Sequence, residues 1–203
     1  PGSIIIASGV MPKELGLENE KALRGRGVSY CAICDGPLFK GKEVAVVGGG
    51  DSALDEAVYL AGVAGKVHLI HRRDEFRASP IMAQRALEHP KIRVMWESVV
   101  TEVVGAEVGG FNEIQHLKLR NVKTDEESTL DVGGLFVAIG HEPNTGFLGG
   151  QIDLKDSGYI QVAEAGRTVT NVPGVFAAGD SYNDVTMIRA AHSGMFFRAP
   201  ETI

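Results

Sequence analysis

The stretch "KEVAVVGGGDSALDEAVYLAGVAGKVHLIHRRDEF", residues 42–76, decides the fold. Two short apolar runs, 43–47 and 66–71, flank a Gly-rich turn and a segment with apolar residues at helical spacing over 51–63. A strand, a helix of about three turns and a second strand form a βαβ unit, in which the strands are parallel and both faces of the sheet are covered. The sequence therefore predicts an α/β fold with strand 43–47, helix 51–63 and strand 66–71.

The rest of the chain extends this pattern. Buried strands are predicted over 3–9 and 133–140, further strands over 92–96, 158–162 and 174–180, and a second helix over 76–88. Residues 99–123 alternate in polarity around Gly109-Gly110, which indicates an antiparallel hairpin or meander. We therefore expect a three-layer domain over roughly residues 10–140, with a parallel sheet between helices on one face and an antiparallel meander on the other.

Composition limits the classes of partner. The chain has 203 residues and a net charge of −6 without a long basic run, which argues against nucleic acid or an anionic membrane as the main partner. No apolar run reaches the ~18 residues of a membrane-spanning helix. The first ten residues, "PGSIIIASGV", lack the basic start of a signal peptide, so we expect a cytoplasmic protein.

A phosphate-binding turn is predicted between the first strand and the helix of the βαβ unit. Residues 48–53 read Gly-Gly-Gly-Asp-Ser-Ala, the pattern G-x-G-x-x-A in the context that a dinucleotide fingerprint requires. Gly48 permits the tight turn, Gly50 lets the backbone approach a pyrophosphate at the helix N-terminus, and Ala53 permits close helix–strand packing. The alternative is a Gly-rich turn without a ligand.

A basic cluster follows the second strand, where an NAD site usually places an acidic residue for the ribose hydroxyls. The strand ends in His71-Arg72-Arg73, and Arg77 lies one turn later. Guanidinium groups at this point suit a 2′-phosphate and favour NADP(H) over NAD(H). The alternative is a solvated basic helix start, although a helix N-terminus disfavours cations without an anionic partner.

The chain has two cysteines, Cys31 and Cys34, and their C-x-x-C spacing favours a redox pair. Exchange requires a thiolate, and the adjacent Asp35 is a candidate acid/base for its proton. The alternatives are half of a metal site, for which two further ligands with a matching motif are missing, or two unrelated buried thiols.

Taken together, "GRGVSYCAICDGPLFKGKEVAVVGGGDSALDEA", "VHLIHRRDEFRAS" and "GLFVAIGHEPNT" resemble bacterial low-molecular-weight thioredoxin reductases, and the likeness runs from about residue 3 to 180. That family passes electrons from NADPH to FAD, then to the C-x-x-C and then to thioredoxin. The resemblance implies that Cys34 faces the flavin, Cys31 attacks the partner disulfide and Asp35 is the acid/base. It implies cofactor-binding roles for Gly48, Gly50, Asp51, Ser52, Ala53, His71, Arg72, Arg73 and Arg77, and, at the late flavin motif, for Gly179 and Asp180.

The resemblance also implies a domain plan. Residues 1–9 are expected to be a remnant of an FAD-type lobe, 10–140 the NADPH-binding domain with the redox C-x-x-C, and 141–203 the C-terminal half of the FAD-type lobe with an atypical tail. The fold expected is therefore a Rossmann-like ββα domain of the FAD/NAD(P)-binding class plus a partial second lobe. The family's first FAD unit, with its own G-x-G-x-x-G, is absent from this sequence, which predicts poor FAD binding by this chain alone. Thioredoxin or a similar disulfide protein is the expected partner, and a homodimer is possible.

The tail departs from the family. "SYNDVTMIRAAHSGMFFRAPETI", residues 181–203, resembles the late metal loop of haloacid-dehalogenase-type phosphatases, in which Asp180 and Asp184 would lie near Mg²⁺. None of the ten aspartates forms the D-x-D pair that supplies the phosphatase nucleophile, so no catalytic metal site is predicted. The leading hypothesis is an NADPH-dependent, flavin-linked dithiol–disulfide oxidoreductase or a fragment of one. An NADPH-binding module without autonomous activity is the alternative, and a Mg²⁺-dependent phosphatase-like fragment is a remote one.

Overall fold

The computed structural model describes residues 3–108, 110–163 and 167–178. The chain divides into two compact units, a central unit, Pro12–Gly140, and a flanking unit formed by Pro1–Met11 and His141–Ile203. Gly179, Asp180 and the phosphatase-like tail lie outside the described residues. Among the residues described, no helix combines the length and apolar character needed to cross a bilayer.

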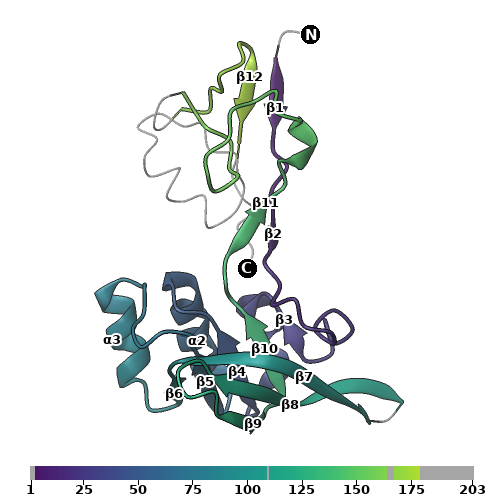
Figure 1. Ribbon diagram of the computed structural model, residues 1–203, viewed down its shortest axis with the longest axis vertical. Helices are drawn as coiled ribbons and strands as arrows, with labels where there is room; N and C mark the ends of the chain where they lie inside the picture. Colours follow the sequence, from purple (N-terminus) through teal and green to yellow (C-terminus); the bar gives the residue numbers. More distant parts are fainter. Residues whose placement is uncertain (1–2, 109, 164–166, 179–203) are drawn as a thin grey trace. The chain divides into compact units, whose positions relative to one another are not determined.

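The central unit is built on a parallel sheet of five strands in the order β3-β10-β4-β5-β6 (Figure 1). The register places Val46 beside Leu69 and Phe136, so the predicted βαβ unit forms the middle of the sheet. The strands are β3 (Val28–Ser29), β4 (Glu43–Val47), β5 (Lys66–Ile70), β6 (Ile92–Met95) and β10 (Gly134–Val137).

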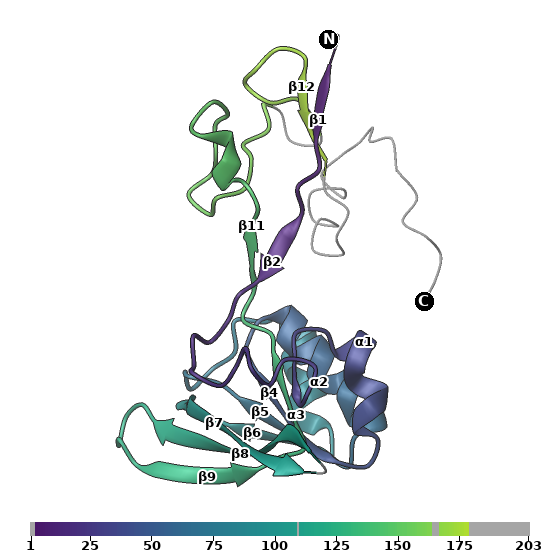
Figure 2. The same ribbon diagram turned by 90° about the vertical axis from the view of Figure 1, so that its right-hand side faces the viewer.

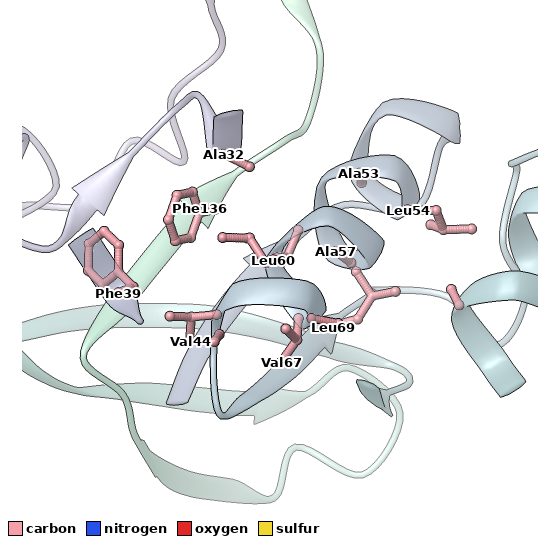
Figure 3. Packing of buried hydrophobic residues seen from close by; sticks show 14 residues of the cluster. Ala32, Phe39, Val44, Ala53, Leu54, Ala57, Leu60, Val67, Leu69 and Phe136 are labelled. Atoms are coloured by element: carbon pink, nitrogen blue, oxygen red, sulfur yellow. The ribbon is translucent and has the colours of Figure 1, made fainter. Parts of the chain in front are cut away.

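Helices cover one face of this sheet. The longest, α2 (Asp51–Val63), buries Ala53, Leu54, Ala57, Leu60 and Ala61, which is the i, i+1, i+4, i+7, i+8 stripe of an amphipathic helix. These side chains pack on the alternate residues of β4 and β5 that point to the same side (Figure 3). The shorter elements of this layer are α1 (Ala32–Asp35), the 3₁₀ helix η1 (Gly36–Phe39) and α3 (Pro80–Glu88).

An antiparallel meander covers the other face, as predicted (Figure 2). Its strands are β7 (Ser98–Val108), β8 (Phe111–Asn121) and β9 (Glu127–Asp131). Val103 and Leu117 from the meander pack against Ala45 and Ile70, the sheet residues that face away from α2. The central unit is therefore the expected three-layer, Rossmann-like ββα domain.

Several predicted elements were wrong in extent or type. The second helix begins at Pro80 rather than residue 76, because Pro80 occupies the first turn and a residue before proline is disfavoured in helical conformation. Residues 158–162 form only the isolated bridge of Ile160 to Leu154. The strand predicted as buried over 3–9 is β1 (Ile4–Ile6), in which Ile4 and Ile5 are exposed because β1 belongs to a two-stranded sheet.

The flanking unit has little regular structure among its described residues. β1 pairs in parallel with β12 (Val175–Ala177), and β2 (Val10–Pro12) pairs with β11 (His141–Pro143). The short helix η2 (Gly146–Leu148) follows β11. Among its described residues, one buried cluster consists of Ile6, Leu148, Ile152 and Val175.

Candidate active site

The Gly-rich turn that joins β4 to α2 leaves no room for a side chain at Gly48. A Cβ added at Gly48 would lie 2.5 Å from the Ala138 carbonyl oxygen and 2.5 Å from the Ala53 Cβ. The turn therefore requires both Gly48 and the small Ala53, which are two of the residues that the sequence assigned to the cofactor. At Gly50 the same added atom would meet nothing within 4 Å. The backbone here is thus open to a ligand at the start of α2.

The N-terminus of α2 has no side-chain cap, because Gly50 occupies the N-cap position. Ser52 is exposed beside it. The carboxylate of Asp51 accepts hydrogen bonds from the backbone N–H and the hydroxyl of Ser79, both at 2.8 Å, and these bonds lower the pKa of Asp51. Asp51 thus ties α2 to the N-cap residue of α3. The helix end remains available to an anion, which its dipole favours.

The His71 side chain packs against the Gly-rich turn at Gly49. Its imidazole is buried, and a Cβ added at Gly49 would collide with it. Nε2 donates to the Glu75 carbonyl oxygen at 2.9 Å, and the ring packs near Phe76 and Trp96. Burial lowers the pKa of His71, so the ring stays neutral at physiological pH. His71 supports the shape of the turn.

The basic loop that follows β5 is fastened to the Gly-rich turn. The backbone N–H of Arg77 donates to the Gly49 carbonyl oxygen at 2.8 Å. The side chains of Arg72, Arg73 and Arg77 are exposed, and within the described part of the chain none forms an ion pair with a carboxylate. The structure thus brings the two halves of the predicted dinucleotide signature together.

The two cysteines form a disulfide with a Cα–Cα distance of 5.3 Å. Cys31 is the N-cap of α1, and the Cys34 N–H donates to the Cys31 Sγ at 3.2 Å. Cys34 is exposed, whereas Cys31 is half-buried. Ala32 between them is buried in the same core as Ala53 and Leu60, which anchors the redox pair to the sheet (Figure 3).

Ser29, at the end of β3, links the disulfide to the predicted acid/base. Its buried Oγ donates to the Asp35 carboxylate at 2.6 Å and accepts the Cys31 N–H at 3.1 Å. Ser29 therefore bridges the Asp35 carboxylate and the backbone of Cys31. The sequence analysis missed Ser29, whose only signal is a short polar side chain at the end of an apolar strand.

A second network supports the residue before the disulfide. The Tyr30 hydroxyl donates to Glu20 at 2.8 Å, and this bond, together with burial as the larger cause, raises the pKa of Tyr30. The buried Glu20 carboxylate also accepts the backbone N–H groups of Leu15, Gly16 and Leu17. The sequence analysis also missed Glu20, because a single glutamate in a polar connection has no distinguishing pattern. This network fixes the segment that enters the redox site.

Exposed apolar side chains lie close to the disulfide in the sequence. Ile33, inside the C-x-x-C, is 59% exposed, and Leu38 on η1 is 72% exposed. Tyr59 of α2 lies against Gly36, where an added Cβ would come within 3.0 Å of its ring. Such a group of exposed apolar residues beside a reactive centre is typical of a docking surface.

The flanking unit has a pocket lined by small and apolar residues, including Ile6, Gly9, Tyr159 and Ala177. Ala177 and Ala178 directly precede Gly179 and Asp180, the predicted flavin-binding pair that lies outside the described residues.

A family model described as pyridine nucleotide-disulphide oxidoreductase matches residues 2–194. The chain belongs to this family. Membership in the pyridine nucleotide-disulphide oxidoreductases implies the use of a flavin and a pyridine nucleotide in general. The match continues past Asp180, while the phosphatase-like interpretation of residues 181–203 stays a prediction.

Named relatives sharpen the placement within the pyridine nucleotide-disulphide oxidoreductases. Thioredoxin reductase from Streptomyces coelicolor is 51% identical over 178 residues, which cover 88% of this chain and 53% of that protein. The Rickettsia prowazekii thioredoxin reductase is 47% identical over 194 residues, or 95% of this chain and 62% of that protein. The resemblance predicted from the motifs is confirmed. The chain spans a little over half the length of these relatives.

Solved structures agree in fold. The crystal structure of Lactococcus lactis thioredoxin reductase matches with a TM-score of 0.81 at 38% identity, over 93% of this chain and 62% of that one. The T. acidophilum thioredoxin reductase gives a TM-score of 0.80 at 33% identity, over 93% and 61% of the two chains.

Proposed function

We propose that this chain carries the NADPH-binding and dithiol-bearing part of a thioredoxin reductase. In this proposal, electrons pass from NADPH through a flavin to the Cys31–Cys34 disulfide and then to a disulfide of thioredoxin or a similar protein. One observation carries the proposal. A disulfide with one exposed cysteine lies in the same compact unit as an open helix N-terminus and arginines that form no ion pair with a carboxylate among the described residues.

The nucleotide half of the proposal rests on electrostatics. The uncapped start of α2 and the open backbone at Gly50 suit a pyrophosphate. Arg72, Arg73 and Arg77 supply fork-shaped donors for a 2′-phosphate, which NADPH has and NADH lacks. His71 and Asp51 act indirectly, by supporting the turn and joining α2 to α3.

The thiol half rests on hydrogen bonds around the disulfide. Two electrons and one proton convert the Cys31–Cys34 bond into one thiolate and one thiol. The thiolate attacks the partner disulfide to form a mixed disulfide, and attack by the second cysteine then releases the reduced partner and restores the Cys31–Cys34 bond. The Cys34 N–H that donates to the Cys31 Sγ favours a thiolate at Cys31. In this proposal Asp35, whose carboxylate accepts the Ser29 hydroxyl, holds or releases the proton. Ile33 and Leu38 offer apolar contact area to the partner protein.

A flavin, when bound, accepts hydride from NADPH and delivers electrons to a disulfide. The small residues of the flanking-unit pocket, among them Gly9 and Ala177, leave room for part of such a group, and the predicted ligands Gly179 and Asp180 follow directly in the sequence. The alternative function, an NADPH-binding module without autonomous activity, would show itself as a purified chain that stays colourless after incubation with FAD.

Trapping of the mixed disulfide tests the thiol roles. We expect Cys34→Ser to leave Cys31 free to attack oxidised thioredoxin and to accumulate a covalent complex, visible on a non-reducing gel. The matched variant Cys31→Ser should trap little, because the remaining thiol lacks the Cys34 N–H donor. Equal trapping by both variants, or trapping by Cys31→Ser alone, would contradict the assignment and point to the more exposed Cys34 as the nucleophile.

A further inference from the structure

The basic loop between β5 and α3 contains carboxylates as well as arginines. Asp74 directly follows Arg73, and Glu75 follows Asp74. Both acidic residues are exposed, as are the arginines on either side of them. A carboxylate that reached these guanidinium groups would compete with a 2′-phosphate for them and would repel the phosphate. The selectivity of the loop therefore depends on where the Asp74 carboxylate is held.

Lys123, in the turn between β8 and β9, holds that carboxylate. Its Nζ lies 3.3 Å from the Asp74 Oδ2 and also pairs with the Glu97 carboxylate. The bonds to Glu97 and then to Asp74 raise the pKa of Lys123. The pKa of Asp74 is lowered by its own backbone N–H first and then by Lys123. Lys123 therefore stays charged, and Asp74 stays ionised, across the physiological range.

The backbone supports this placement of Lys123. Glu97 adopts a left-handed conformation with φ of 54°, and its N–H donates to the Arg73 carbonyl oxygen at 3.1 Å. The carbonyl oxygen of the same residue accepts the Val122 N–H at 2.6 Å. One residue thus fastens the basic loop and the β8–β9 turn to each other. The contact between Lys123 and Asp74 is part of a connected structure, whereas an isolated surface pair would depend on two mobile side chains.

We propose that Lys123 is a specificity-determining positioning residue, which binds the Asp74 carboxylate and so leaves Arg72, Arg73 and Arg77 to the 2′-phosphate of NADPH. The inference rests on the proposed NADPH-binding function. It assigns to the meander a part in nucleotide selection, although the fingerprint residues all lie in the βαβ unit and the loop after it.

A double-mutant cycle tests the inference on the full chain. Four proteins are compared: the unchanged chain, Lys123→Ala, Asp74→Asn and the double variant. Dissociation constants for NADPH and NADH are measured by calorimetry at low ionic strength, where surface charges act most strongly. Glu75→Gln, placed in the unchanged chain and in Lys123→Ala, is the matched control, because it removes a neighbouring charge that Lys123 does not contact.

Lys123→Ala should weaken NADPH binding about two- to five-fold, the range expected for exposed ion pairs, and leave NADH binding unchanged. Asp74→Asn should restore NADPH binding in the Lys123→Ala background and have a smaller effect in the unchanged chain. Glu75→Gln should have the same effect in both backgrounds, because only interacting residues give non-additive changes. Lys123→Arg should retain the affinity for NADPH.

Three results would overturn the inference. Equal weakening of NADPH and NADH would mean that Lys123 supports the fold alone. If Asp74→Asn did not restore NADPH binding in the Lys123→Ala background, Lys123 would instead contact the 2′-phosphate directly. If Asp74→Asn changed NADPH affinity equally in both backgrounds, Lys123 would act only through its positive charge and not by binding Asp74. Failure of the proposed function is separate, since the unchanged chain would then show no preference for NADPH over NADH.

Discussion

Three consecutive glycines meet two different requirements in the turn after β4. Gly48 lies against the Ala138 carbonyl oxygen and Ala53, and Gly49 lies against the His71 imidazole, so added atoms would collide at both. Gly50 borders open space. The first two glycines therefore serve packing, and the third serves access of a ligand to the helix N-terminus.

Alanine substitutions separate these roles. Gly49→Ala should lower the free energy of unfolding by about 1–3 kcal/mol, since His71 is held by Glu75 and cannot move freely. Gly50→Ala should change that free energy by less than about 0.5 kcal/mol, because its φ of −100° suits alanine, yet it should weaken NADPH binding. Urea denaturation and NADPH titration of both variants give the comparison. A stable Gly49→Ala protein would show that His71 is less constrained than the packing indicates.

At the scale of the element, α2 contains one side chain that its amphipathic pattern does not explain. Glu56 lies beside the buried Ala57, and its Oε2 is buried without a hydrogen-bond partner in the described residues. Burial, with a smaller effect from Asp55, raises the pKa of Glu56 to about 7. Because the folded-state pKa lies above the unfolded value of 4.5, this group stabilises the fold most at low pH, and that contribution is lost as the pH rises through 7.

Glu56→Gln should therefore stabilise the protein more at pH 8 than at pH 5. We expect a difference of about 1–3 kcal/mol between the two pH values, lower than full burial would give because the side chain is partly accessible. Urea denaturation at both pH values measures it. Glu88→Gln on the exposed face of α3 controls for the loss of one negative charge. A stabilisation of Glu56→Gln that is independent of pH would contradict a protonated Glu56.

Helix α2 and its neighbouring strands were predictable because their apolar spacing is regular, and the turn before α2 has a fixed motif. The start of α3 was missed, although Pro80 gives a signal, because the apolar pattern begins earlier at Phe76. Lys123 contacts a carboxylate that is distant in sequence. The contacts of Ser29 and Glu20 are short-range, but they follow no regular spacing that would indicate them. The motifs thus supplied the candidate residues of the nucleotide and thiol sites, which stay predictions, and sequence reasoning missed the supporting contacts of Ser29, Glu20 and Lys123.

At the scale of the whole molecule, the described parts of the two units differ in the size of their buried clusters. The central unit has buried clusters on both faces of its five-stranded sheet. The described part of the flanking unit has one small buried cluster and two-stranded sheets, which are marginal on their own. The central unit therefore has the features of an independently folding domain.

Residues 12–140, produced as a separate polypeptide, should fold and unfold cooperatively in urea. This fragment contains the Gly-rich turn, the basic loop and both cysteines, so its dissociation constant for NADPH should lie within about two-fold of that of the full chain, a difference below 0.5 kcal/mol. Circular dichroism and calorimetry provide the measurements. A fragment that folds but no longer binds NADPH would show that the nucleotide site needs residues of the flanking unit.

The ends of the central unit meet: the Lys13 N–H donates to the Gly140 carbonyl oxygen at 2.9 Å. The two ends of the unit thus lie side by side, as the ends of inserted domains do. A short linker between these ends would allow circular permutation, with new termini opened in a surface loop elsewhere. Adjacent ends also allow the unit to be inserted into a loop of an unrelated host protein. The inserted domain would carry the disulfide and the arginines together.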